Sequence, residues 1–131
     1  MSRTALNETR LLNLDLDIRA RSGLRKLMTA MGPAVSVLNY QSRRLLSVEI
    51  GNVQPKTIDE GIRLFFELVE SLEPAARRTW DRCDSRSVNI GLQTEAHPQQ
   101  AHFQISKEAI VMLAHMRAEV AITIYASSKQ R

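Results

Sequence analysis

Hydrophobic and polar residues alternate one by one along several short stretches of the chain, which is the pattern of a strand with one buried face. The clearest stretch covers residues 12–19, where leucine and isoleucine alternate with Asn13, Asp15, Asp17 and Arg19. Similar patterns predict strands at residues 34–40, 44–50, 88–93, 101–105 and 120–125. The chain is therefore expected to form about six strands.

Other stretches carry apolar residues at every third or fourth position, which is typical of a helix packed on one side. The strongest helix follows Thr57, which forms a capping-box pattern with Glu60, and its apolar residues run from Ile58 to Leu72. Shorter helices are predicted after the N-caps Ser22 and Ser106. A further short helix is predicted from residue 74, where a proline suits the first helical position.

Helices mixed with strand hairpins indicate an α+β fold, with a mostly antiparallel sheet of about six strands and three main helices packed on one face. The length of 131 residues and the hydrophobic fraction of 44% are ordinary for one globular core. We expect residues 1–131 to form a single α+β domain, with flexible ends at residues 1–10 and 127–131.

The alternation also assigns side chains to the two faces of the predicted sheet. The helices are expected to cover the apolar face, which carries Leu14, Leu16, Val48, Ile90, Phe103 and Ile122. The opposite face then presents short polar groups, which can bind a partner with little loss of side-chain entropy. The candidate partner-binding residues are Asp15, Asp17, Glu49, Asn89, Gln93, His102 and Gln104. The alternative is a solvated face without a function, which is common in antiparallel sheets.

The sequence contains no pattern that assembles a catalytic or metal centre. The single cysteine, Cys83, lies three residues after Trp80 on the apolar side of a short helix, which favours a buried structural thiol. The histidines His97, His102 and His115 have no metal-ligand spacing. Asp15 and Asp17 project from the same side of a strand, but no second catalytic element accompanies them. We therefore predict no catalytic residues, no metal, no cofactor and no enzymatic activity.

The charge of the chain allows a second interpretation of its function. The net charge is +4, and many of the basic residues are arginines in local groups. Arginine suits phosphate, so a small regulatory or nucleic-acid-binding module is the alternative function. Nucleic acid is not favoured as the partner, because aromatic residues make up only 5% of the chain and most of them are expected in the core.

The composition also bears on the compartment. No apolar run is long enough for a membrane span, and residues 1–10 are too polar for a signal peptide. A single cysteine fits a reducing compartment. We therefore expect a cytoplasmic protein with no membrane partner.

Four segments carry a resemblance to known proteins. They are Leu72-Glu73-Pro74 leading to Trp80-Asp81, then Asn89-Ile90-Gly91-Leu92-Gln93, then Phe103-Gln104-Ile105-Ser106, and finally Ala121-Ile122-Thr123-Ile124-Tyr125. In these segments the chain resembles small stand-alone bacterial α+β proteins of the kind found among the immunity proteins of contact-dependent growth inhibition and polymorphic-toxin systems. The resemblance implies a cytoplasmic inhibitor that binds one cognate toxin domain, often a nuclease. The basic net charge departs from the acidic character common in inhibitors of nucleases.

Overall fold

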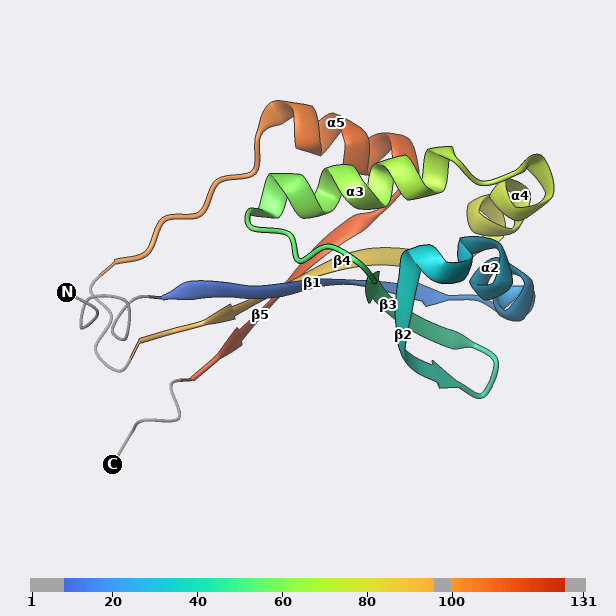
Figure 1. The fold of residues 1–131 in the computed structure, drawn as a ribbon, viewed down its shortest axis with the longest axis horizontal. Coiled ribbons are helices and arrows are strands. Elements are labelled where there is room, and N and C mark those ends of the chain that lie inside the picture. Colours follow the sequence, from blue (N-terminus) through green and yellow to red (C-terminus); the bar gives the residue numbers. More distant parts are fainter. Residues whose placement is uncertain (1–8, 96–99, 127–131) are drawn as a thin grey trace.

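The computed structural model describes residues 9–95 and 100–126, and within them the chain forms five strands and four α-helices (Figure 1). The elements follow one another as β1 (Arg10–Arg19), α2 (Leu24–Met31), a 3₁₀ turn (Gly32–Ala34), β2 (Val35–Gln41), β3 (Leu45–Ile50), α3 (Ile58–Glu70), α4 (Pro74–Arg82), β4 (Ser85–Gln93), α5 (Lys107–Met116) and β5 (Glu119–Tyr125).

The five strands form one mixed sheet in the order β2-β3-β1-β4-β5. The first strand of the chain, β1, is therefore the central strand. It pairs antiparallel with both neighbours, and Leu16 faces Val48 of β3 on one side and Val88 of β4 on the other. The last strand, β5, pairs with β4 in the parallel direction, because α5 carries the chain back along the sheet before β5 begins.

The α+β class is confirmed, but two details of the expected architecture are wrong. The sheet has five strands instead of about six, and α4 is a nine-residue helix that brings the number of α-helices in the described residues to four. The missing strand is the one expected at residues 101–105, which have no strand assignment. The edge of β4 that such a strand could have joined is occupied by β5.

Two of the three predicted N-cap residues are found at the start of their helices. The Thr57 hydroxyl accepts a hydrogen bond from the Glu60 N–H at 3.0 Å, and the Ser106 hydroxyl accepts one from the Ala109 N–H at 3.1 Å. The cap expected at Ser22 is wrong. The residue that precedes α2 is Gly23, whose left-handed φ of 91° explains the glycine at this position.

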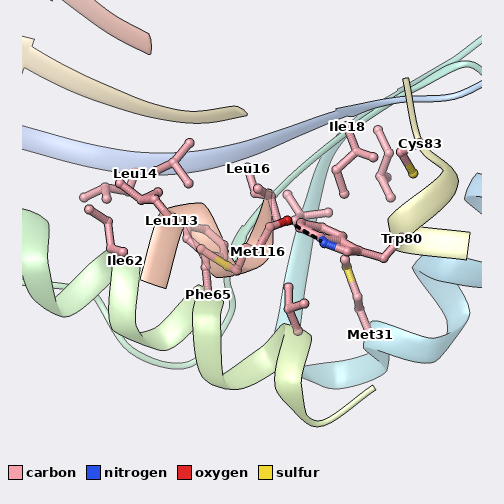
Figure 2. Packing of buried hydrophobic residues seen from close by; sticks show 14 of the residues in the cluster. Leu14, Leu16, Ile18, Met31, Ile62, Phe65, Trp80, Cys83, Leu113 and Met116 are labelled. Atoms are coloured by element: carbon pink, nitrogen blue, oxygen red, sulfur yellow. Dashed lines mark hydrogen bonds between the residues drawn. The ribbon is translucent and has the colours of Figure 1, made fainter. Parts of the chain in front are cut away.

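The core lies between the sheet and one layer of helices. In Figure 1, α3 and α5 are stacked over the strands, while α2 and α4 lie at one end of the sheet. Leu16, Ile18, Phe65 and Trp80 are completely buried in one hydrophobic cluster (Figure 2). The Trp80 indole N–H donates to the Met116 carbonyl oxygen at 2.9 Å, shown dashed in Figure 2, and so connects α4 to the end of α5.

The expected apolar face is only partly covered by the helices. Leu14, Leu16, Val48 and Ile90 are buried as expected, whereas 39% of Phe103 and 58% of Ile122 are exposed. Ile122 lies beside Ile90 in the register, but β5 is the edge strand and the helix layer covers mainly the central strands. Phe103 is exposed because its segment does not join the sheet.

The expectation of flexible ends falls mostly outside the described residues, which exclude 1–8 and 127–131. Within the described part, Arg10 already belongs to β1, so the first strand begins two residues earlier than the alternation suggested.

Candidate functional site

The open face of the sheet, opposite the helix layer, carries a group of three carboxylates near its centre. Asp15 lies in the middle of β1 directly opposite Asn89 of β4. Asp17 lies opposite Ser47 of β3 and Ser87 of β4, and Glu49 follows Val48 on β3. We call Asp15, Asp17 and Glu49 the acidic cluster. Alternation along β1 explains its position, since the side chains of Leu14 and Leu16 point into the core.

The Asp15 carboxyl group is in an electrostatically unfavourable position. Its Oδ1 atom is shielded from solvent and has no hydrogen-bond partner in the part of the chain that the structure describes. The pKa of Asp15 is raised from its ordinary value of 3.8 to about 6, mainly by burial of the group and also by the negative charges of Asp17 and Glu49. The ionised form of Asp15 is therefore destabilised in the isolated protein.

Polar groups on β4 and β5 extend this face beyond the acidic cluster. The Thr123 hydroxyl donates to the Asn89 amide oxygen at 2.9 Å, and the Arg10 guanidinium donates to the Gln93 amide oxygen at 3.2 Å. Gly91 lies between them on β4, where a Cβ atom would collide with the side chain of Asn13. The open face is thus a polar surface on which some side chains form hydrogen bonds with neighbouring strands of the sheet.

Five of the seven predicted site residues lie on strands of the sheet, and two do not. Asp15, Asp17, Glu49, Asn89 and Gln93 belong to β1, β3 and β4. His102 and Gln104 were expected on a strand beside them, and this expectation is wrong. Both are exposed in the segment that leads into α5, because residues 101–105 pair with no strand.

The described residues contain no group of three or more histidine, cysteine or acidic side chains arranged to hold a metal ion. His115 Nε2 instead lies 3.1 Å from Glu70 Oε2, and its ring contacts the edge of Phe66. His97 lies outside the described residues. Cys83 is buried, and its thiol donates to the Thr79 carbonyl oxygen at 3.2 Å. Burial also raises the pKa of Cys83, which opposes formation of a thiolate nucleophile.

A second charged surface lies at the end of the molecule formed by α2, α4 and the tip of the β2–β3 hairpin. Two adjoining cavities of about 560 and 640 Å³ open there. Six basic side chains line them: Arg21, Arg25, Lys26, Arg43, Arg78 and Arg82. We call this surface the basic groove. Along the sequence these basic residues form separate local groups, and only the fold brings the groups together.

Comparisons of the chain with protein-family models, with curated proteins and with solved structures found no match. In residues 9–95 and 100–126, none of the helices has the length and apolar character needed to cross a membrane.

Proposed function

We propose that this protein is a non-enzymatic inhibitor that binds another protein through the open face of its sheet. The observation that carries the proposal is the position of Asp15. An acid whose oxygen atom is shielded and lacks a partner costs stability, and two further carboxylates beside it increase this cost. A lysine or arginine from a partner would remove the cost by supplying both the opposite charge and hydrogen-bond donors.

The chemistry of the acidic cluster therefore indicates a partner with a basic binding surface. Proteins that act on nucleic acids have such surfaces, because they bind phosphate groups with lysine and arginine. Together with the resemblance of four segments to bacterial immunity proteins, this supports a more specific proposal. The partner would be a cognate toxin domain, such as a nuclease, that the chain neutralises in the cytoplasm. A face built on paired strands suits this role, since it holds the carboxylates in fixed positions.

The test uses a variant that removes charge from the open face without changing the fold. Asp17→Asn combined with Glu49→Gln leaves Asp15 in place and replaces two partly exposed carboxylates by amides of the same shape. Glu67→Gln combined with Glu108→Gln is the matched control, because it removes two charges from exposed positions on α3 and α5.

The wild type and the two variants are treated with nuclease and then mixed with the protein encoded by the neighbouring upstream gene. The affinity of each for this protein is measured by calorimetry. We expect a one-to-one complex with the wild type, a loss of about tenfold in affinity for the open-face variant, and little change for the control. Protection of bacterial cells that produce the toxin should follow the same order. Equal affinity of both variants would exclude the open face, and a failure of the wild type to bind or to protect would exclude the immunity role.

A further inference from the structure

In the part of the chain that the structure describes, some arginines form hydrogen bonds or ion pairs within the fold and others do not. Arg77 forms ion pairs with Glu70 at 2.9 Å and with Asp81 at 3.4 Å. Arg86 donates to the carbonyl oxygens of Trp80, Cys83 and Arg117. By contrast, the six basic side chains of the basic groove form no ion pair with any carboxylate in the described residues. Their positive charges are available to a ligand.

The charge of the groove is strongly one-sided. The larger cavity is lined by five of the basic residues and by no acidic residue. Among the described residues that line this cavity, its neighbour and a small adjoining pocket, the only acidic ones are Glu73 and Asp84. Six basic and two acidic residues give an excess of +4, which equals the formal net charge of the whole chain. The charge imbalance of the protein is thus concentrated at one end.

The arrangement of these charges is unfavourable for the isolated protein. Arg78 and Arg82 are four residues apart on α4, where two like charges lie on the same side of a helix and repel each other. The groove also brings Arg25 of α2 and Arg43 of the hairpin toward the same cavity. A polyanion bound between them would convert this repulsion into attraction.

The remaining lining of the groove also suits an anion. Ser22 and Tyr40, whose side chains carry hydroxyl groups, also line the larger cavity, whereas the hydroxyl of the lining residue Thr79 donates to the Ala75 carbonyl oxygen at 3.3 Å. The first turn of α2 borders it, and that turn has neither an acidic residue nor a side-chain cap. Gly23 holds this turn close to α4, since a Cβ atom at this position would lie only 2.8 Å from the Thr79 methyl carbon.

We propose that the basic groove is a binding site for a ligand that carries two or more phosphate groups. An excess charge of +4 is balanced by about two to four phosphates, because each carries a charge of roughly −2 to −1 depending on its esterification. Guanidinium groups bind phosphate oxygens in pairs, and the cavity volumes lie in the range of ordinary ligand sites. Free oligophosphates, including nucleotides, and the backbone of single-stranded RNA share this chemistry.

Two probes distinguish these sources: inorganic tripolyphosphate, measured by calorimetry, and a fluorescently labelled RNA of twelve nucleotides without secondary structure, measured by polarisation. The groove variant is Arg25→Ala with Arg82→Ala, and both side chains are exposed. The control is Lys56→Ala with Arg63→Ala, which lowers the net charge equally at exposed positions outside the groove. The Arg43→Ala variant supplies a second groove substitution on a different element if the first variant is unfolded.

We expect the wild type to bind at least one probe at low salt, the control to bind within twofold of it, and the groove variants to bind at least tenfold more weakly. Affinity should also fall steeply as salt increases. Binding of tripolyphosphate without RNA would assign the site to free oligophosphates, and RNA binding that is at least tenfold tighter than tripolyphosphate binding would assign it to a nucleic-acid backbone. If neither probe binds, or if groove and control variants lose affinity equally, the proposal is wrong. This test of the basic groove is independent of the test of the open face, because the open-face variant Asp17→Asn with Glu49→Gln leaves every residue of the groove unchanged.

Discussion

Asp15 and Arg86 are two charged side chains with opposite effects on the fold. Arg86 has its guanidinium group bonded to three backbone carbonyl oxygens, at 2.9, 2.9 and 3.0 Å, and so joins the ends of α4 and α5. Asp15 has an oxygen atom without a partner among the described residues. The alternating pattern of β1 is enough to predict that Asp15 lies on the polar face of the sheet. That its Oδ1 atom is shielded from solvent could not be predicted, because it depends on the pairing of β1 with β3 and β4.

Asp15→Asn should increase the free energy of unfolding at pH 7. The folded protein holds the Asp15 proton up to about pH 6, whereas the unfolded chain releases it near pH 3.8. The ionised carboxyl therefore destabilises the fold above pH 6, and this penalty disappears as the pH falls toward 3.8. We expect a gain of about 1 kcal/mol at pH 7, less than the full shift implies because the group is partly exposed.

The pH dependence of this effect is measured by urea unfolding of the wild type and the Asp15→Asn variant at pH 7 and pH 4.5. The difference in stability between the two proteins should shrink at the lower pH. Asp84→Asn serves as the control, since Asp84 is exposed and should show no comparable gain. A variant less stable than the wild type at pH 7 would mean that Asp15 has a stabilising partner.

Arg86→Met should destabilise the protein by about 2 kcal/mol, because it retains the apolar part of the side chain but leaves three carbonyl oxygens without their charged donor. Thermal unfolding followed by circular dichroism measures the loss. Arg82→Met, four residues earlier at an exposed position, should change the melting temperature little. Equal losses in the two variants would show that the hydrogen bonds of Arg86 contribute nothing specific.

At the scale of elements, the sequence predicted the type and approximate position of the four α-helices and five strands in the described residues, but it also predicted a strand at residues 101–105 that does not form. The failure has a physical cause. Alternation at Ala101, Phe103 and Ile105 indicates an extended chain with one apolar side, but a strand also needs a free partner. The sheet edge beside β4 is taken by β5, whose parallel pairing depends on the path of α5 and leaves no mark in the local pattern.

The two adjacent phenylalanines of α3 offer a test of which side of this helix faces the core. Phe65 is completely buried, whereas Phe66 is only partly buried and contacts the ring of His115. Phe65→Ala should cost about 3–5 kcal/mol of stability, and Phe66→Ala clearly less. Urea unfolding of the two variants measures both values. A larger loss for Phe66→Ala would mean that the helix is rotated relative to the sheet.

At the scale of the whole molecule, the charges are arranged in two regions. β1 connects them, since it carries Asp15 and Asp17 on the open face and ends at Arg19, just before Arg21 of the basic groove. The sequence could supply the acidic residues of one strand, because they are close along the chain. It could not assemble the groove, which draws on residues 21–26, 43 and 78–82. The only feature of the sequence that pointed to the groove was the pair of like charges, Arg78 and Arg82, on one side of a predicted helix.

This separation of charge predicts behaviour on a cation-exchange column at neutral pH. Proteins bind such a surface through their most concentrated positive region as well as through net charge. Arg25→Ala with Arg82→Ala should therefore elute at lower salt than Lys56→Ala with Arg63→Ala, although both variants lose two charges. Elution at the same salt concentration would show that the groove does not dominate the field of the protein.

The strand order β2-β3-β1-β4-β5 has a consequence for biosynthesis. Among the five strands, the central strand β1 is synthesised first. The β2–β3 hairpin that follows can form locally and pair with one edge of β1. The next strand, β4, attaches to the other side, and β5 is added last at the outer edge of β4. No strand has to be inserted between two that are already paired. The sheet can thus grow outward in the order of translation, without opening any hydrogen-bonded ladder formed earlier.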